Sequence, residues 1–202
     1  MDPVKKLYLA SSNSEKLREF SAIAADIHST FELALLPGFS KLPAFPEEAP
    51  TFAENAVGKV LHAATMTDDI VCADDSGLVV PALGGQPGVH SARYAGANAT
   101  AAQNIEKLVG ALAGKNGKKR EAYFVCALAV SKKRRVVAVI TNRAEGMILE
   151  APRGSSGFGY DPLFFSPSLN KTFAELSSTG KNLHSHRGKA FRRLLEVLPG
   201  ML

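Results

Sequence analysis

Two adjacent carboxylates, Asp74 and Asp75, are the residues whose types and spacing most directly indicate chemistry. They follow the apolar run 70–73 and precede Ser76-Gly77, which is typical of a buried strand ending in a polar turn. Ligands of α/β proteins collect beyond the carboxyl ends of such strands. Neighbouring carboxylates repel each other unless a cation or a shared proton relieves them, and a divalent metal there is typical of phosphate chemistry. The alternative is a solvated corner built from ordinary turn residues.

The segment 11–16, Ser-Ser-Asn-Ser-Glu-Lys, is a candidate anion site. It lies between a predicted strand and a predicted helix, and Ser12 and Glu15 have the spacing of a capping box. The free N–H groups at a helix start attract anions, and Lys16 would add a full positive charge. The glycine pattern of a Walker loop is absent from this segment. A capped helix with a surface lysine is the alternative.

The helix predicted from Thr51 to about Met66 carries a third set of candidates. Thr51 and Glu54 form a second capping-box pattern. Asn55 and Lys59 are four residues apart and therefore share one face. An inward-facing Lys59 would touch a phosphate or a carboxylate, whereas an outward-facing one would be solvated.

The Pro-rich loop 37–50 carries two further carboxylates, Glu47 and Glu48. Either one could complete a metal shell with Asp74 or Asp75, since carboxylate oxygens suit a hard divalent cation. A merely acidic loop is the alternative.

The segment 157–162, Gly-Phe-Gly-Tyr-Asp-Pro, has the features of a site for a flat ligand. Glycines let the backbone approach a ligand closely, and Phe158 or Tyr160 could stack on a nucleobase. Asp161 could accept hydrogen bonds from ring N–H groups. The alternative is a tight turn whose aromatic side chains belong to the core.

The segment 181–189 concentrates two histidines, one arginine and two lysines before a predicted helix. Zinc is a poor fit, because two histidines without a nearby Cys or Glu make an incomplete ligand set. Hydrogen bonding to a nucleobase carbonyl or to phosphate explains His186 and Arg187 better.

Composition places the chain among soluble globular proteins. At 202 residues with 46% hydrophobic content it suits one domain over residues 1–202, with or without a second lobe. No apolar run is long enough for a bilayer and no signal-peptide core follows the start, so we expect a cytoplasmic protein without a membrane partner. Cys72 and Cys126 lie in apolar runs and are expected to be reduced core thiols.

The net charge of +5 is concentrated in two basic clusters, 115–120 and 132–135. Both flank predicted strands and lack interleaved aromatic residues that could stack on bases. We therefore expect solvated hairpin tips and no nucleic-acid partner.

Helices and strands alternate early in the chain and strands cluster later, which predicts an α/β fold with a mixed sheet. The expected strands are 6–10, 31–36, 70–73, 78–80, 121–130, 135–142 and 144–149. The expected helices are 15–27, 51–66, 101–112 and 189–198, and the Gly-rich stretches 83–96 and 154–162 are expected to be loops.

Six segments, in this order, resemble the inosine triphosphate pyrophosphatase family. They are Ser-Ser-Asn-Ser-Glu-Lys (11–16), Thr-Phe-Ala-Glu-Asn-Ala (51–56), Ala-Asp-Asp-Ser-Gly-Leu (73–78), Gly-Gln-Pro-Gly-Val-His-Ser-Ala-Arg-Tyr (85–94), Gly-Phe-Gly-Tyr-Asp-Pro-Leu-Phe (157–164) and Ser-His-Arg-Gly-Lys-Ala (185–190). The resemblance implies hydrolysis of ITP, dITP and XTP to the monophosphate and pyrophosphate with Mg²⁺. It also implies an elongated mixed sheet flanked by helices, two lobes around a central active-site cleft, and a homodimer.

The resemblance also implies residue roles. Asp75 would be the general base and, with Glu47, a metal ligand, while Asp74 supports the site. The residues implied to bind the nucleotide are Ser11, Ser12, Asn13, Ser14, Glu15, Lys16, Lys59, Ser76, Phe158, Gly159, Tyr160, Asp161, Lys181, His186 and Arg187.

Two positions depart from the family pattern. Ser11 replaces the usual Thr and keeps the hydroxyl. The acidic loop usually reads Glu-x-Gly-x-Thr-Phe, whereas this chain has Glu-Glu-Ala-Pro-Thr-Phe at 47–52. An ungapped alignment selects Glu47 as the ligand, and a shift of one residue selects Glu48.

The implied reaction is an in-line attack of water on the α-phosphorus, with Asp75 taking the proton. A 6-keto purine accepts a hydrogen bond where adenine presents a donor, so a buried donor such as His186 or Arg187 would select against adenine. Two rival functions are a Maf-like pyrophosphatase acting on modified or pyrimidine nucleotides, and a basic nucleic-acid-binding module.

Overall fold

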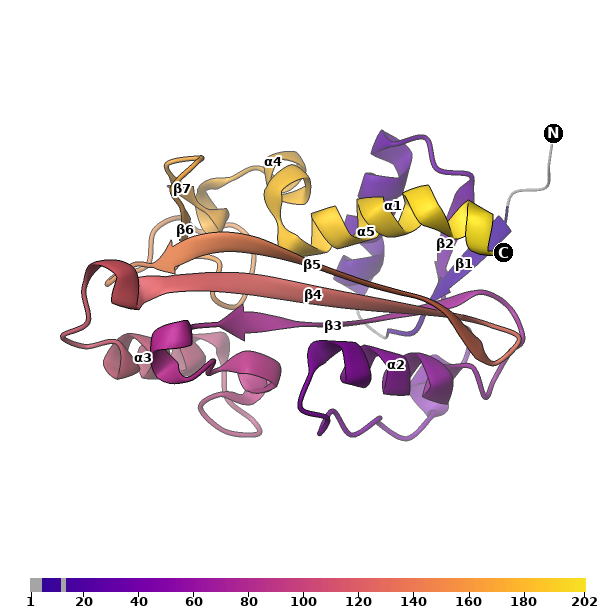
Figure 1. The fold of residues 1–202 in the computed structure, drawn as a ribbon, viewed down its shortest axis with the longest axis horizontal. Coiled ribbons are helices and arrows are strands. Elements are labelled where there is room, and N and C mark those ends of the chain that lie inside the picture. The colour runs from indigo at the N-terminus through magenta and orange to yellow at the C-terminus, as the bar shows by residue number, and fades with distance from the viewer. Residues whose placement is uncertain (1–4, 12–13) are drawn as a thin grey trace. The chain divides into compact units, whose positions relative to one another are not determined.

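The computed structural model describes residues 5–11 and 14–202, and it confirms the α/β class (Figure 1). The strands are β1 (Lys5–Leu9), β2 (Phe31–Leu35), β3 (Val71–Val79), β4 (Glu121–Lys132), β5 (Arg135–Ile148), β6 (Phe164–Ser166) and β7 (Lys171–Thr172). The helices are α1 (Ser14–Asp26), α2 (Phe52–Ala63), α3 (Ala101–Ala111), α4 (Ser178–His184) and α5 (His186–Val197). Over the described residues the strands form one seven-stranded sheet in the order β2-β1-β3-β4-β5-β6-β7.

The sheet is mixed, as predicted. β1 pairs with β2 and with β3 in parallel, placing Tyr8 opposite Val71 and Leu9 opposite Cys72. β6 pairs with β5 and with β7 in antiparallel orientation. No described helix combines the length and the apolar character that crossing a membrane requires.

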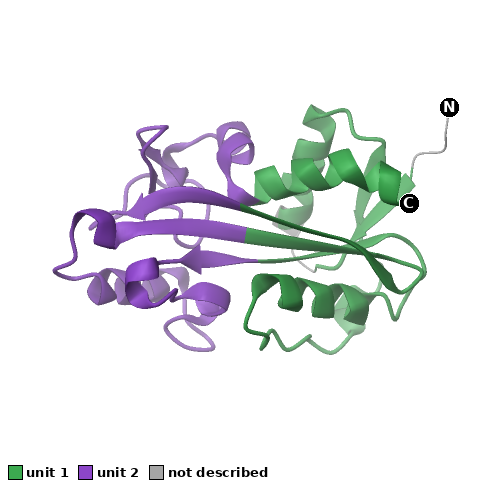
Figure 2. Ribbon diagram, viewed as in Figure 1, with its two compact units in different colours: residues 1–75, 126–142, 187–202 green, residues 76–125, 143–186 purple. Residues whose placement is uncertain are grey.

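The chain divides into two compact units, which are described separately (Figure 2). Unit 1 comprises residues 1–75, 126–142 and 187–202, and unit 2 comprises residues 76–125 and 143–186. The expectation of a single domain over residues 1–202 stays a prediction.

In unit 1, the strands present alternate side chains to two different helix layers. α1 and α5 cover one face of the strands, and α2 covers the other (Figure 1). Strand residues on the first face are large or sulfur-containing (Leu7, Leu9, Cys72, Cys126, Leu128 and Val130). Those facing α2 are mostly small (Ala10, Val71, Ala73, Ala127 and Ala129). The period of two thus gives one thick apolar layer and one close helix–sheet contact.

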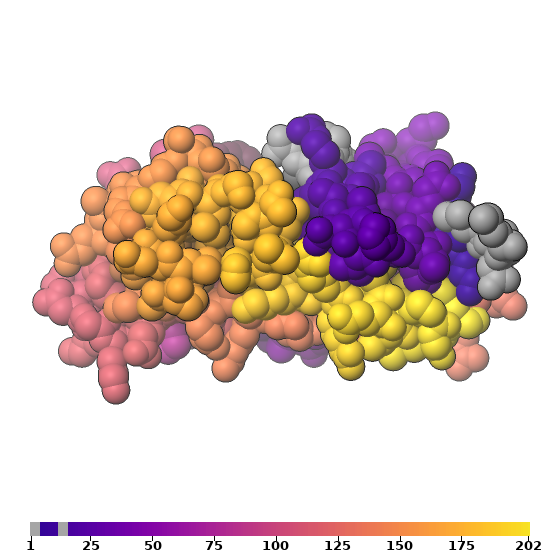
Figure 3. Space-filling view, turned by 90° about the horizontal axis from the view of Figure 1, so that it is seen from above, coloured from indigo at the N-terminus to yellow at the C-terminus, as the bar shows by residue number. Residues whose placement is uncertain are grey.

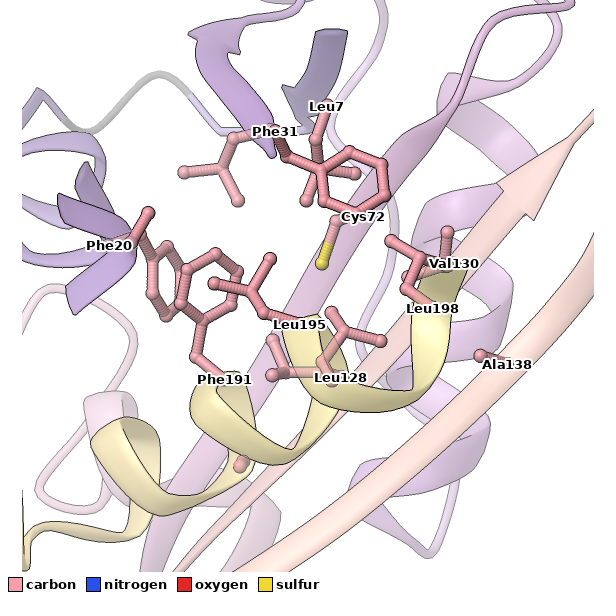
Figure 4. Packing of buried hydrophobic residues seen from close by; sticks show 14 of the residues in the cluster. Leu7, Phe20, Phe31, Cys72, Leu128, Val130, Ala138, Phe191, Leu195 and Leu198 are labelled. Atoms are coloured by element: carbon pink, nitrogen blue, oxygen red, sulfur yellow. The ribbon is translucent and has the colours of Figure 1, made fainter. Parts of the chain in front are cut away.

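The apolar layer of unit 1 centres on a pair of aromatic rings. Phe20 of α1 and Phe191 of α5 are buried, with ring centroids 4.3 Å apart. Figure 4 shows the two rings side by side, and the outer surfaces of α1 and α5 adjoin in Figure 3. Cys72 and Cys126 are buried free thiols, which confirms that expectation.

Unit 2 has its own core beneath α3. The ring centroid of Phe164 lies 4.5 Å from that of Phe124 and 4.8 Å from that of Phe173. Leu108 and Leu112 of α3 belong to the same cluster.

The basic cluster 115–120 is not a solvated hairpin tip throughout, so that prediction was wrong at Arg120. The Arg120 side chain is buried and donates to the carbonyl oxygens of Ile148 at 2.6 Å and Leu149 at 2.8 Å. It also donates to the carbonyl of Leu112 at 3.1 Å. A guanidinium has five N–H donors, so one side chain can satisfy several chain-end carbonyls at once.

Four element predictions were also wrong. β3 runs without interruption from Val71 to Val79, so Asp-Asp-Ser-Gly lies inside a strand instead of ending it. β5 is likewise continuous across the predicted break after residue 142. α5 begins at His186, three residues earlier than expected, and the Gly-rich stretch 83–96 contains a 3₁₀ helix at Gly88–Arg93.

The Phe20–Phe191 contact generates a stability prediction. Replacing Phe191 with Ala should lower the free energy of unfolding by about 3–5 kcal/mol, because Phe191 is fully buried and the substitution would leave a cavity in the core. Urea titration measures the change. The matched control is Leu61→Ala on α2, where the side chain is 40% exposed and the expected change is within about 0.5 kcal/mol. Equal losses in the two variants would contradict this description of the core.

Candidate active site

The two carboxylates Asp74 and Asp75 lie in the middle of β3, where successive side chains point to opposite faces of the sheet. Asp74 contacts Lys16 on α1 and Arg187 on α5. Asp75 instead hydrogen-bonds Asn55 on α2. Neighbours in the sequence therefore meet two separate sets of charges.

Asp74 is a carboxylate held beside two cations, Lys16 and Arg187. It is 2% exposed, and Lys16 Nζ donates to its Oδ1 at 2.8 Å and its Oδ2 at 2.9 Å. Arg187 Nε lies 3.8 Å from Oδ2. Burial alone would raise the pKa of Asp74, but Lys16, Arg187 and Lys59 outweigh it and hold the pKa well below its usual range. This side chain holds cations in place and does not exchange protons near neutral pH.

Asp75 has the opposite character. It is 7% exposed, and burial raises its pKa to about 6, with Glu47 and Asp74 adding to the effect. Lys59 and the hydrogen bond from Asn55 act in the other direction without cancelling the rise. A carboxyl group with a pKa near neutrality can accept and release a proton during catalysis.

Lys59 faces inward, as one of the two interpretations of the sequence required. Its ammonium donates to the main-chain oxygen of Asp74 at 2.9 Å and forms an ion pair with Glu47. Burial would lower its pKa, but Asp74, Glu47 and Asp75 together raise it. Lys59 therefore stays charged beside three carboxylates.

Thr51 begins α2 as expected: its Oγ1 accepts from the backbone N–H of Glu54 at 3.2 Å. Its hydroxyl donates to the Glu54 carboxylate at 2.7 Å. Asn55 is buried one turn later and exchanges hydrogen bonds with the backbone of Ala49. This cap fixes the start of the helix that presents Asn55 and Lys59 on one face.

A cavity of about 380 Å³ adjoins these charges in unit 1. Its polar lining consists of Ser11, Lys16, Ser40, Glu47, Lys59 and Asp74. Of the predicted anion site, Ser12 and Asn13 lie outside the described residues, and α1 begins at Ser14, close to the expected Glu15.

Two carboxylates of this cluster fit a hard divalent cation. No three described His, Cys, Asp or Glu side chains are grouped to hold a metal ion. Asp75 and Glu47 nevertheless influence each other electrostatically, because Glu47 raises the pKa of Asp75. Two carboxylates with substrate phosphates and water are the set that Mg²⁺ usually takes in nucleotide sites. Glu48 is exposed, whereas Glu47 is half-buried against Lys59.

A second cluster lies in unit 2. Phe158 is 55% exposed, and the Lys181 ammonium lies 4.5 Å from its ring centroid. Lys181 also pairs with Asp161 at 2.5 Å, and Asp161 accepts from the backbone N–H of Phe158 at 2.9 Å. Gly157 has a φ of +77°, and a Cβ there would overlap the Asp161 carboxylate. The turn therefore presents an exposed ring beside a fixed cation.

The structure separates the two aromatic candidates of this turn. Tyr160 is buried, and its hydroxyl donates to the carbonyl of Ser91 at 2.9 Å, so its ring belongs to the core. Phe158 is the ring that remains accessible for stacking. His186 is buried and stacks on Phe124, with centroids 4.7 Å apart.

Sequence analysis did not single out Glu19, which accepts from Arg187 Nη1 at 3.1 Å. Glu19 is three residues after Lys16 on α1, so helical spacing places it on the same face. That spacing was the available signal. The predicted substrate contacts of Ser11 to Lys16, Ser76, His186 and Arg187 stay predictions.

A mixed α/β sheet carrying a buried carboxylate pair, with two lysines and an adjoining cavity, defines an acid–base site of the kind that suits phosphate chemistry. The chain belongs to the Ham1 family, whose model matches residues 7–197. It is 48% identical over 193 residues to the dITP/XTP pyrophosphatase of Geobacillus kaustophilus, covering 96% of this chain and 94% of the relative. It is 47% identical over 189 residues to that of Gloeobacter violaceus, covering 94% and 92%.

Solved structures agree with this assignment. A HAM1 protein from Coxiella burnetii is 41% identical and superimposes with a TM-score of 0.87 over 97% of this chain and 99% of that one. The Ham1 protein of Staphylococcus aureus is 38% identical, with a TM-score of 0.86 and the same coverage.

The opposite surroundings of Asp74 and Asp75 predict opposite effects of the same substitution. The pKa of Asp75 is raised in the folded protein, to about 6, so its ionised form costs stability above that pH. Metal-free Asp75→Asn should therefore gain about 1–3 kcal/mol at pH 8. The gain should shrink as the pH falls through 6 towards the ordinary Asp value of about 3.9. Urea titration across pH 4–8 measures it.

Asp74→Asn is the matched variant. In the wild type, the pKa of Asp74 is lower in the folded state than in the unfolded state. Ionised Asp74 therefore stabilises the fold at any pH above its unfolded-state pKa. Removing it leaves buried cations without their anion and should cost about 3–5 kcal/mol at pH 7. A higher free energy of unfolding in Asp74→Asn, or a lower one at pH 8 in Asp75→Asn, would contradict the opposite pKa shifts assigned to the two aspartates.

Proposed function

We propose that this protein hydrolyses deaminated purine nucleoside triphosphates (ITP, dITP and XTP) to the monophosphate and pyrophosphate. The observation that carries the proposal is the near-full-length similarity to proteins named dITP/XTP pyrophosphatase. The buried Asp74–Asp75 pair supports it, because one carboxyl is fixed as an anion and the other has a pKa near neutrality.

In this proposal water attacks the α-phosphorus and Asp75 accepts its proton. The new bond joins the water oxygen to the α-phosphorus, and the bond to the α–β bridging oxygen breaks, so that pyrophosphate leaves. Lys16 and Lys59 stabilise the charge on the phosphate oxygens. Asp74 keeps Lys16 in place through two hydrogen bonds.

We further propose that Mg²⁺ is the cofactor and that Asp75 and Glu47 hold it. Their carboxylates have the oxygen chemistry that this cation prefers, and Glu47 is the half-buried member of the Glu47–Glu48 pair. When bound, the ion would screen the polyphosphate charge. Lys59 keeps Glu47 close to the site through their ion pair.

We assign base recognition to the cluster of unit 2. Phe158 offers an exposed ring for stacking, and Lys181 lies beside it. A lysine ammonium only donates hydrogen bonds, so it can pair with the 6-keto oxygen of hypoxanthine or xanthine but not with the 6-amino group of adenine. Leaving that donor unpaired would cost roughly 1–3 kcal/mol with adenine. Asp161 fixes the ammonium at 2.5 Å.

The same proposal includes a cytoplasmic homodimer with no nucleic-acid or membrane partner, as the family resemblance implies. The alternative, a Maf-like pyrophosphatase for modified or pyrimidine nucleotides, predicts faster turnover of dTTP or dUTP than of ITP.

Hydrolysis of ITP in ¹⁸O-labelled water tests the reaction. We expect pyrophosphate release that requires Mg²⁺, with the label in the monophosphate, because water attacks the α-phosphorus. Asp75→Asn should lower kcat by about 10²–10⁴-fold while remaining folded. Label in the pyrophosphate, faster turnover of dTTP than of ITP, or a near-normal rate in Asp75→Asn would each contradict the proposal.

A further inference from the structure

Gly58 occupies an interior position of α2, where glycine lowers helix stability by roughly 0.5–1 kcal/mol relative to alanine. Its φ does not require glycine, so backbone conformation gives no reason for the residue. A Cβ at this position would overlap the ring of Phe45, with Cζ and both Cε atoms nearby. The Phe45 ring therefore occupies the space that a side chain at position 58 would need.

Phe45 belongs to the segment 37–50, which we call the strap. Several contacts join the strap to α2. The Phe45 ring packs on Gly58 and lies 5.9 Å from the His62 ring, centroid to centroid. The Pro43 carbonyl oxygen lies 2.9 Å from His62 Nε2. The Ala49 backbone exchanges hydrogen bonds with Asn55 at 3.0 and 3.3 Å, and Glu47 forms an ion pair with Lys59.

Glu47 therefore lies midway between two attachment points, with Phe45 two residues before it and Ala49 two residues after it. The Ala49 attachment uses Asn55, whose side chain also hydrogen-bonds Asp75. The Phe45 attachment is a packing contact of its ring with Gly58 and with the His62 ring, and its close approach to Gly58 requires the absence of a Cβ there. An exposed carboxylate on an irregular loop has many conformers, and two fixed neighbours reduce them to those that reach Lys59.

We propose that Phe45 and Gly58 are positioning residues that hold Glu47 in the candidate active site; this rests on the proposed function of Glu47 as a metal ligand. Phe45 has no ionisable or hydrogen-bonding group in its side chain, so we expect it to act through the strap. Its effect is on where Glu47 lies, and so on cation affinity.

The strap also supplies the apolar wall of the 380 Å³ cavity, through Phe39, Leu42, Pro43, Ala44 and Phe45. The polar part of the lining that comes from outside the strap consists of Ser11, Lys16, Lys59 and Asp74. An apolar wall lowers the local dielectric and strengthens the charge interactions at the polar part. Loosening the strap should therefore weaken the site without unfolding the helix beneath it.

Gly58→Ala is the direct test, and Gly110→Ala is the matched control because a Cβ at Gly110 on α3 meets open space. Both replace a helical glycine with alanine. Gly110→Ala should keep or raise thermal stability, whereas in Gly58→Ala the gain in helix propensity is opposed by displacement of the Phe45 ring, and the protein should remain folded. In calorimetric titrations of the resting protein with Mg²⁺, Gly58→Ala should bind roughly tenfold or more weakly. Gly110→Ala should match the wild type. Equal Mg²⁺ affinity in the two variants would overturn the proposal.

Trypsin cleavage after the exposed Lys41 reports the strap itself, without metal or substrate. We expect faster cleavage in Gly58→Ala and in Phe45→Ala, identified by mass spectrometry. The double variant should be no faster than either single one, because both break the same contact. Additive effects, or cleavage at the wild-type rate in Gly58→Ala, would overturn the proposed anchor.

The two readouts separate this inference from the proposed function. If the wild type and Glu47→Gln bind Mg²⁺ equally, Glu47 is not a ligand and that part of the proposed function fails. The anchor is then decided by the Lys41 cleavage rates alone. The other case is that Glu47→Gln weakens Mg²⁺ binding while Gly58→Ala is cleaved faster but binds Mg²⁺ as the wild type does. That combination of results would show that the strap does not position Glu47.

Discussion

The buried ion pair between Asp74 and Lys16 is the interaction on which the site depends. Asp74 is 2% exposed in the centre of β3, a position that a carboxylate can occupy only if cations compensate it. Lys16 supplies two hydrogen bonds from α1, and Arg187 adds a second cation from α5. Glu19 in turn binds Arg187. The charge of one strand residue thus connects both helices that pack on that face of unit 1.

The same strand creates the second half of the site by alternation. Asp75 points away from Lys16 and meets Asn55 on α2, where compensation by Lys59 is offset by Glu47 and by Asp74 itself. The pKa of Asp75 is raised chiefly because the carboxyl is buried, and the nearby positive charge does not compensate for that burial. Small residues on this face, such as Ala73 and Ala127, let α2 lie close to the sheet. Packing therefore brings Asn55 and Lys59 within reach of the carboxylate.

Much of unit 1 could be predicted because its signals are local. The Thr51 cap, the apolar face of α2 and the parallel strands at either side of α1 all follow from periodicity and capping. The Asp-Asp-Ser-Gly segment was misread for the same reason. Its turn preference is local, whereas β3 continues beyond its pairing with β1 at Val71 and Cys72 as a neighbour of β4, and this long-range strand pairing overrides the local preference. A run of polar residues inside a central strand is itself the mark of a site.

Other features depend on contacts between distant residues. β6 and β7 are two or three residues long and have no periodicity to detect. The burial of Arg120 depends on carbonyls of Ile148 and Leu149, almost thirty positions away. The reason for Gly58 likewise lies in Phe45, thirteen residues earlier. Residue types indicated which side chains were candidates, but only packing decided whether each faced a core, a charge or a cavity.

The central claim is that adjacent aspartates on one strand have opposite protonation behaviour, so that only Asp75 can act as the base. ¹³C NMR of the side-chain carboxyl groups, recorded on metal-free protein across pH 3–8, measures it directly. The structure predicts one aspartate with a midpoint of about 6, absent from Asp75→Asn. The Asp74 resonance should remain that of a carboxylate throughout the folded range. An Asp75 midpoint near the ordinary value of about 3.9, or protonation of Asp74 at a higher pH than Asp75, would contradict the account.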